Sequence, residues 1–350
     1  MPSWVLERRP ASLWVRPLIP LAAVLVTFLL TSVLVLLSGK NPLEVYYYFL
    51  LAPLSNEVSA VEVLVKSTPL LFTGAAVTFA FAAGYWNIGA EGQLLAGAIA
   101  AAGLGMVVKG WPPALAILVM VLGGFAAGLL WALIPALLKV RLAVDEVVTT
   151  LLMNTIILFL ISFLLNGVWR DPVTHFPQSP TIVEEAMFPK IVPMSRLHLG
   201  FLIAWVAVGV CWLVLKRTGL GLRMRAMGLG AEAARFAGVK VNRTLLIAAL
   251  VSGGIAGVAG ASEVCGIHFH LIESISPGYG YTGIIAATLG GLNPLAVGLA
   301  SLFIGLIETG AQSVSRALGV PIYLGNVVEA TLLLVTLSML LLQNYRIRRG

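Results

Sequence analysis

Long apolar runs recur along this chain of 350 residues, and most approach the ~20 residues with which an α-helix crosses the ~30 Å hydrocarbon layer of a bilayer. Charged residues make up only 11% of the chain, whereas a soluble domain carries about 25%. These observations exclude an ordinary soluble domain, a disordered chain and a coiled coil. The runs also lack the alternation over about 10 residues that marks the strands of an outer-membrane barrel. The sequence therefore predicts an all-α polytopic membrane protein.

About ten of these runs are expected to be transmembrane helices. They are Leu18–Leu37, Val63–Ala83, Gly92–Val108, Pro113–Leu138, Glu146–Leu165, His198–Leu215, Thr244–Glu263, Thr282–Gly290, Pro294–Thr309 and Val327–Leu342. The run Thr282–Gly290 is too short to span the bilayer alone, so it is either half of a broken helix or begins earlier. Ten spans divide into five and five, which gives two halves of inverted topology, an arrangement common in transporters.

The distribution of basic residues predicts the orientation. With the N-terminus inside and ten alternating spans, 15 of the 22 Lys and Arg residues lie on the inner side. This bias places both termini in the cytoplasm, whereas nine or eleven spans would put the basic C-terminal end outside. The expected organisation is a cytoplasmic N-terminal segment (residues 1–17), one transmembrane domain (18–342) and a basic cytoplasmic tail (343–350). The net charge of +7 indicates orientation and contact with anionic membrane lipid, not nucleic-acid binding.

Two polar stretches interrupt the apolar runs. Residues 167–197 contain five prolines and are expected to form an outer loop that acts as a lid or a docking site. Residues 216–243 carry seven basic residues and one acid, Glu232, on the inner side. Within them Gly230–Phe236 is predicted to be a short helix that Gly238 ends. Such a helix on the inner membrane face is suited to contact a cytoplasmic partner, although a solvated positive-inside loop has the same composition.

Polar residues inside the apolar runs are candidates for a cavity lining. Trp86, Asn87, Glu91 and Gln93 lie in a glycine-rich stretch, and Asn154 follows in a later span. A glutamate at the centre of a bilayer costs about 2.5–3.5 kcal/mol on insertion scales, and non-helical backbone survives there only when buried or lining a watery cavity. A plain cytoplasmic turn around Glu91 is the alternative. Two later acids, Glu308 and Glu329, are weaker candidates of the same kind.

The stretch 263–281 combines acids, histidines and aromatic residues. The spacing of Glu263, Cys265, His268, His270 and Glu273 matches no standard zinc pattern, so no metal site is predicted. A polar, aromatic loop along a substrate path fits better. Phe269, Tyr279 and Tyr281 are suited to stack on a flat ligand, a contact worth about 1–3 kcal/mol for a nucleobase. Aromatic residues are also simply common at membrane interfaces.

Glycines form faces at helical spacing, and catalytic motifs do not occur. Gly253, Gly254, Gly257 and Gly260 make one such face, and Gly123, Gly124 and Gly128 make another, which predicts close helix packing. The sequence contains no Walker A motif, HExxH or GxSxG, so a membrane enzyme is not supported. We therefore expect a non-catalytic protein that binds no cofactor of its own.

Four ordered blocks stand out along the chain, namely Thr68–Gly74 with Trp86–Gln93, Asp145–Asn154, Arg225–Val239, and Ser276–Gly283 with Leu289–Pro294. They resemble blocks of the permease subunits of bacterial ABC importers for nucleosides and simple sugars, a superfamily that also holds ribose and branched-chain amino-acid permeases. The resemblance covers about Val63–Leu342, and the form of Trp86–Gly92 is similar to the nucleoside branch. Asp145-Glu146 stands where that branch commonly has Asn-Glu, a change that keeps the capping chemistry.

The resemblance implies an importer in a bacterial cell membrane in which different subunits bind the substrate, form the path and hydrolyse ATP. An extracytoplasmic binding protein would deliver a nucleoside, and this chain with a second, related permease would form the path. Partner ATPase subunits would bind ATP and Mg and grip the coupling segment. The implied path residues are Trp86, Asn87, Glu91, Gln93, Asn154, His268, Phe269 and Tyr279; the implied coupling residues are Arg225, Gly228, Glu232, Arg235 and Gly238. The alternatives are an ABC permease for a simple sugar and an ion-coupled secondary transporter.

Overall fold

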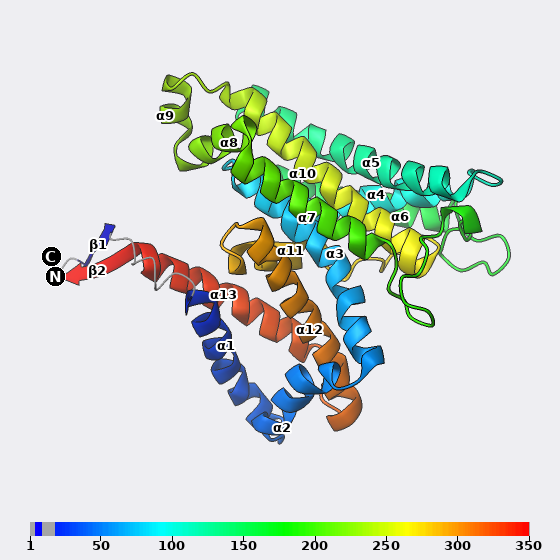
Figure 1. Cartoon of the computed structure of the whole chain (residues 1–350), viewed down its shortest axis with the longest axis horizontal. Coiled ribbons are helices and arrows are strands. Elements are labelled where there is room, and N and C mark those ends of the chain that lie inside the picture. The colour runs from blue at the N-terminus through cyan, green and yellow to red at the C-terminus, as the bar shows by residue number, and fades with distance from the viewer. Residues whose placement is uncertain (1–3, 9–17, 350) are drawn as a thin grey trace.

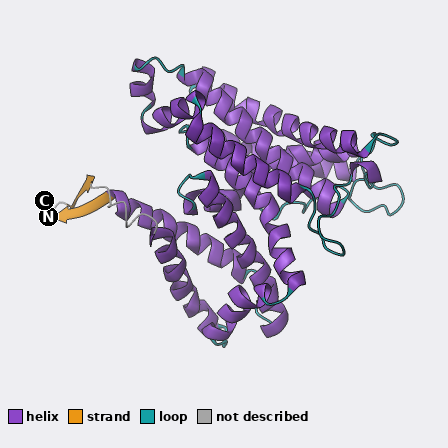
Figure 2. Cartoon of the chain, viewed as in Figure 1, coloured by secondary structure: helices purple, strands orange, loops and turns teal. Residues whose placement is uncertain are grey.

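The computed structural model describes residues 4–8 and 18–349, and most of this part of the chain is helical (Figures 1 and 2). The helices are α1 (Leu18–Leu37), α2 (Pro42–Tyr46), α3 (Glu57–Phe81), α4 (Ala90–Gly105), α5 (Pro113–Leu142), α6 (Glu146–Asn166), α7 (Gly200–Arg217), α8 (Gly219–Leu229), α9 (Ala231–Phe236), α10 (Val241–Glu263), α11 (Tyr279–Leu289), α12 (Pro294–Leu318) and α13 (Leu324–Asn344). Short π-helical turns lie at Tyr47–Leu51 and Val264–His268, and 3₁₀ turns lie at Ala52–Leu54 and Glu184–Ala186.

Each of the ten predicted runs is a helix, and the bounds differ most at α3 and α12. Helix α3 begins before the predicted Val63 because the side chain of Asn56 accepts a hydrogen bond from the backbone N–H of Val58 (2.9 Å) and caps the helix in a polar stretch. Helix α12 continues past the predicted Thr309 until Gly319, whose φ of +66° ends it. Hydrophobic runs therefore locate these helices but do not give their ends.

Six helices of the described chain are long and apolar enough to cross a membrane, namely α3, α5, α6, α7, α10 with its π turn, and α12. Shorter apolar stretches lie in α1 and α13, at Leu21–Leu37 and Leu324–Met339. Helices α4 and α11 have 16 and 11 residues and rise only about 24 and about 16 Å. The chain is a multi-pass membrane protein, and ten crossings in two inverted halves stay a prediction.

The two ends of the described chain pair with each other. Strand β1 (Trp4–Arg8) runs antiparallel to strand β2 (Tyr345–Arg349), with Trp4 opposite Arg349 (Figure 1). Both ends therefore lie at the same end of the molecule, which is the arrangement that an even number of crossings requires. The rest of the predicted N-terminal segment 1–17 lies outside the described residues.

Helices from the two predicted halves interleave. Helix α10 packs on α3, α4 and α5, and helix α12 packs on α3 and α7. The first helix, α1, packs on the last, α13, as Figure 1 shows. The short helix α11 contacts α3, α4, α12 and α13. Helix α11 therefore connects the group around α10 with the group around α12 and α13.

The predicted glycine faces form a seam in which the backbones of α4, α5 and α10 touch. A Cβ added at Gly97 would collide with the carbonyl of Gly257, and one added at Gly257 would collide with the carbonyl of Gly124. At Gly260 the collision would be with the carbonyl of Leu94. The prediction of close packing at these glycines is confirmed, because the three helices leave no room for a side chain along the seam.

Candidate functional site

Helices α3 and α4 are separated by a break at residues 82–89 whose polar groups are buried. Asn87 is fully buried, and its Nδ2 donates to Oε1 of Gln93 (2.8 Å) and to Oγ of Ser252 on α10 (2.9 Å). Its Oδ1 accepts from the backbone N–H of Gly89 and from Nε2 of Gln93, both at 3.0 Å. Backbone that leaves the helix at membrane depth needs such partners. Asn87, Gln93 and Ser252 thus form an amide clamp that holds the break.

Replacing Asn87 with alanine is expected to lower the melting temperature of the folded protein. The substitution removes the partner of the Gln93 amide and of the Gly89 N–H, and each buried polar group left unpaired costs about 1–3 kcal/mol. The measurement is the thermal stability of the purified protein. The matched control is Asn166→Ala, because that exposed amide bonds only to Ser162 in its own helix. Equal melting temperatures for the two variants would contradict the clamp.

Glu91 joins the N-terminus of α4 to the N-terminus of α11. Its side chain is buried, and Oε2 accepts a hydrogen bond from the backbone N–H of Gly280 (2.7 Å). A Cβ at Gly280 would collide with the backbone N of Glu91, so the two helix ends touch through their main chains. The partial positive charge at both N-termini favours a carboxylate at this position. The two helices that are too short to span therefore meet at a buried acid.

Asn154 on α6 connects this junction to its surroundings. Its Nδ2 donates to the carbonyl of Ile88 and to the hydroxyl of Tyr281, both at 3.0 Å. Its Oδ1 accepts from the backbone N–H of Gly92 at 2.9 Å. One amide therefore holds the α3–α4 break, the first turn of α4 and the first turn of α11 together.

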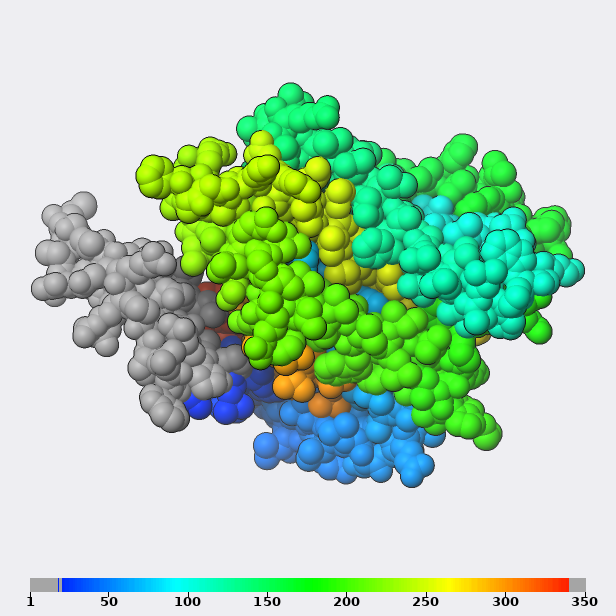
Figure 3. Space-filling model, turned by 45° about the horizontal axis from the view of Figure 1, so that its top comes forward, coloured from blue at the N-terminus to red at the C-terminus, as the bar shows by residue number. Residues whose placement is uncertain are grey.

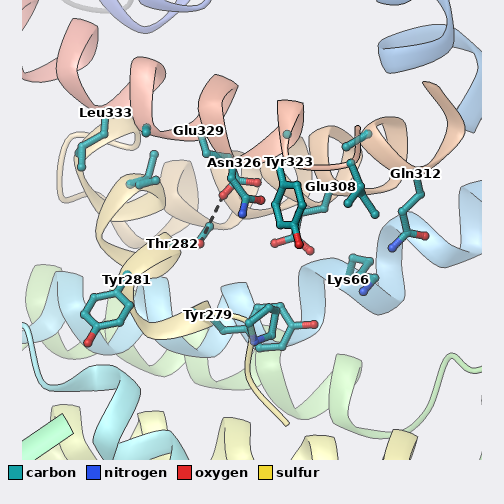
Figure 4. A pocket seen from close by; sticks show the side chains of 17 residues that line it. Lys66, Tyr279, Tyr281, Thr282, Glu308, Gln312, Tyr323, Asn326, Glu329 and Leu333 are labelled. Carbon is teal, nitrogen blue, oxygen red and sulfur yellow. Dashed lines mark hydrogen bonds between the residues drawn. The ribbon is translucent and has the colours of Figure 1, made fainter. Parts of the chain in front are cut away.

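A cavity of about 430 Å³ lies between α3, α11, α12 and α13 (Figure 4). This volume falls within the range of small-molecule sites, about 300–1,000 Å³. Its polar lining consists of Lys66 on α3; Tyr279, Tyr281 and Thr282 on α11; Glu308 and Gln312 on α12; and Tyr323, Asn326 and Glu329 on α13 and the turn before it. Tyrosines, amides and acids thus surround one space between the helices. Ionisable side chains within membrane helices normally line a substrate or ion pathway, or pair with one another.

The two acids of the cavity come from the side opposite Lys66 and Tyr279. Figure 4 shows Glu308 and Glu329 pointing from α12 and α13 into the space above α11. Glu329 is 8% exposed and accepts a long hydrogen bond from Oγ1 of Thr282 (3.4 Å). The two acids therefore lie across the space from Tyr279 and Lys66, and Tyr323 lies on the same side as the acids.

The predicted path residues divide between this cavity and its supports. Tyr279 lines the cavity, Asn154 reaches it through Tyr281, and Glu91 bonds to the first turn of α11. Asn87 and Gln93 belong to the amide clamp, in which their side-chain amides are hydrogen-bonded to each other and do not line the cavity.

The remaining predicted residues lie elsewhere. Trp86 is half exposed beside Phe81, with ring centroids 4.6 Å apart. Nε2 of His268 lies 3.8 Å from Oε2 of Glu263, and Phe269 has a left-handed φ of +60°. The carbonyl of Phe269 accepts from the N–H of Ile182 in the outer loop (2.8 Å). His268 and Phe269 therefore belong to the contact between the end of α10 and the outer loop, not to the cavity lining.

Most of the cavity lining was not predicted. Glu308 and Glu329 were weak candidates because they are acids inside apolar runs. Lys66 carries a similar signal, a single cation in a long apolar stretch, and it was missed. Tyr323 and Asn326 give no such signal, because only the packing of α13 beside α12 brings them to the cavity.

The predicted outer loop, residues 167–197, is folded onto the segment that ends and follows α10. The backbone N–H of Ser179 donates to the carbonyl of Leu271 (3.0 Å), and Oγ of Ser179 accepts from the N–H of Leu271 (2.8 Å). Within the loop the side chain of Asp171 accepts hydrogen bonds from Thr174 Oγ1 and from the N–H of Val173, which lower the pKa of this carboxyl to about 2. These bonds give the loop a defined shape at the surface.

The predicted inner segment contains two helices, α8 and α9 (yellow-green in Figure 3). Helix α8 packs on α7 and α10, and α9 projects from the body of the molecule. The predicted helix Gly230–Phe236 is α9, and Gly238 with a φ of +85° follows it, so both predictions are confirmed. Glu232 and Arg235 form an exposed ion pair on α9 (2.8 Å). Helix α8, which carries Arg225, was not predicted.

The end of α8 rests directly on the α3–α4 break. A Cβ at Gly228 would lie 2.6 Å from the carbonyl O of Ala82, and a Cβ at Gly84 would lie 3.3 Å from Cα of Gly228. Leu229, which follows Gly228 in the chain, and Phe236 on α9 are 88% and 97% exposed. The predicted inner segment therefore has a close main-chain contact with the break, and two of its apolar side chains are left uncovered by the described chain.

Comparison with known proteins gives one family and several relatives. The family model described as "Branched-chain amino acid transport system / permease component" matches residues 59–340. A glucose ABC transporter permease protein of Haloferax volcanii is 33% identical, over 98% of this chain and 94% of its own. A guanosine ABC transporter permease protein of Bacillus subtilis is 33% identical, over 92% and 93%. A nucleoside ABC transporter permease protein of Lactococcus lactis is 30% identical, over 90% and 89%. No solved structure matches.

Proposed function

Since the chain belongs to the family of permease components of branched-chain amino acid transport systems, we propose that it forms the translocation path for nucleosides in an ATP-driven ABC importer. The cavity between α3, α11, α12 and α13 carries this proposal. It joins tyrosine rings, which stack on a nucleobase, with amides and acids that hydrogen-bond to a base edge or a ribose. The guanosine and nucleoside relatives support the same substrate class.

The position of α4 and α11 supports a path at their junction. In the proposed halves α1–α6 and α7–α13, each of these short helices is the third apolar helix of its half. Short helices at corresponding positions of two inverted halves are the feature that points to a transporter's binding site. The proposed topology has ten crossings and both termini in the cytoplasm of a bacterial cell.

Two further kinds of subunit and a binding protein complete the proposed importer. ATPase subunits would bind ATP and Mg and contact α8 and α9, whose Leu229 and Phe236 offer an apolar surface beside basic residues. A second, related permease is supported by the pairs among the relatives, since Bacillus subtilis has two guanosine permease proteins that resemble this chain. An extracytoplasmic binding protein would deliver the nucleoside to the outer loop.

Radiolabelled guanosine uptake into proteoliposomes tests the function. The vesicles contain this chain with its co-purified partners and binding protein, with and without internal ATP. We expect uptake only with ATP, competed by other nucleosides and not by ribose. Uptake that follows an ion gradient without ATP would replace the proposal with an ion-coupled secondary transporter.

A simple sugar is the second candidate substrate. The glucose permease relative from Haloferax volcanii matches this chain over nearly its whole length and supports this alternative. The same vesicles distinguish the two, because ATP-dependent uptake of glucose without uptake of guanosine would keep the transport machine and change its substrate.

A further inference from the structure

We propose that Glu308 and Glu329 are specificity-determining residues that hold the hydroxyl groups of an uncharged ligand and exclude its phosphate ester. This proposal rests on the proposed function, because it takes the cavity as a part of the translocation path. It adds the charge class of the ligand and assigns that selection to two acids of this chain.

The charges of the cavity disfavour an anion. Its ionisable lining consists of two carboxylates, Glu308 and Glu329, one ammonium group, Lys66, and tyrosines, and no arginine lies among the lining residues. A phosphate monoester carries about −1.5 to −2 charges at pH 7 and is normally bound by arginine, lysine or a helix N-terminus. One lysine opposite two acids does not supply the positive field that such a group needs.

Two helix N-termini line the cavity, those of α11 and α13. At α13 the N–H groups of Leu324 and Gly325 donate to the carbonyls of Pro321 and Ile322, both at 3.1 Å. The donors at the N-terminus of α11 are taken up as well. The backbone N–H groups of Gly278 and Tyr279 donate to Oγ of Ser276, at 3.2 and 3.1 Å. The N–H of Gly280 donates to the carboxylate of Glu91 at 2.7 Å. The first turn of α11 is therefore occupied by groups of this chain, and a phosphate would find none of these donors free.

The same acids have spare capacity for hydroxyl groups. Among the described residues Glu308 accepts no hydrogen bond, and Glu329 accepts only the long bond from Thr282. Each carboxyl group has two oxygens that accept hydrogen bonds, so the two acids can pair with the O–H groups of a vicinal diol. Figure 4 places both acids across the space from Tyr279, so hydroxyl groups and a ring would be held on opposite walls.

Binding of three probes to the purified complex tests the selection. The probes are guanosine, 2′,3′-dideoxyguanosine, which lacks the diol, and guanosine 5′-monophosphate, and equilibrium dialysis of the permease with its ATPase subunits measures each. We expect guanosine to bind about tenfold or more tightly than the dideoxy compound, and no binding of the monophosphate at the same concentrations. Equal binding of guanosine and its monophosphate by the unmodified complex would overturn the proposal without any variant.

Two variants assign the selection to the acids. Glu308→Gln with Glu329→Gln is expected to reduce the preference for guanosine over the dideoxy compound to less than about threefold and to admit the monophosphate, because Lys66 then has no opposing charge. Glu44→Gln, at an exposed acid on α2, is the matched control and should keep the selection. Unchanged preference in the double variant, with a complex that elutes normally on size exclusion, would also overturn the proposal.

Failure of the nucleoside assignment can be distinguished from failure of the proposal on the two acids. If no nucleoside binds or is transported while glucose does both, the nucleoside assignment fails. The acids are then tested with glucose and glucose 6-phosphate. Loss of glucose binding in the double variant, with glucose 6-phosphate rejected by the unmodified complex, would support the charge selection, whereas glucose binding that the variant leaves unchanged would overturn it.

Discussion

Exchanging the charges of α9 with Glu232→Lys and Arg235→Glu is expected to lower ATP-dependent uptake by tenfold or more while ATP hydrolysis continues. The side chains of Glu232 and Arg235 are 86% and 57% exposed, so a bound partner would contact both. In the double variant this partner meets a positive charge at position 232 and a negative charge at position 235. Like charges placed across an interface cost several kcal/mol and weaken the correct docking. The measurement compares guanosine uptake and ATPase activity in the same proteoliposomes.

The exchange contains its own folding control. Glu232 and Arg235 pair with each other three residues apart on one helix, and the double variant restores an ion pair of opposite order. Each single variant leaves two like charges at these positions instead. Normal uptake in the double variant would remove α9 from the coupling surface.

Replacing Gly257 with valine is expected to abolish the accumulation of folded protein. On α10 this glycine faces the carbonyl of Gly124 and the backbone of Gly128 on α5, and a side chain would push the two helices apart. Overpacking of a tight core costs typically about 1–3 kcal/mol, and here the colliding atoms are main-chain atoms that have no rotamer in which to move away. The measurement is the yield of monodisperse protein in detergent.

The matched control for the seam is Gly209→Val on α7, where an added Cβ meets nothing within 4 Å. Both variants put the same β-branched residue into a membrane helix, so they differ in packing and not in helix propensity. Similar yields from the two variants would show that the seam tolerates separation.

The sequence allowed the helices to be predicted because each signal lies within one segment. Helix α1 has the predicted bounds, Leu18–Leu37, and Gly238 ends α9 as predicted. The cost of placing Glu91 in a membrane made it a candidate for a cavity lining. In the structure it is buried at the junction of α4 and α11 and is not among the lining residues of the cavity.

The cavity was only partly predictable because its walls come from distant segments. Lys66 and Glu329 approach one space through the packing of α3, α11 and α13, and no local pattern contains that packing. His268 and Phe269 were predicted to line the path because of the polar and aromatic composition of their stretch. In the structure the carbonyl of Phe269 instead accepts a hydrogen bond from Ile182 in the predicted outer loop. Composition identified polar residues inside the membrane and did not reveal which of them face each other.

The contact between Gly228 and Ala82 has a mechanical consequence. Contacts between long side chains absorb small displacements, because the side chains change rotamer before the backbones move. At Gly228 no side chain separates α8 from the carbonyl of Ala82, and the break that begins there continues through the Asn87 clamp to Glu91 at the end of α4. We therefore expect a displacement of α8 to reach the α4–α11 junction through main-chain contacts and buried hydrogen bonds, without rotamer changes at Gly228 that would absorb it.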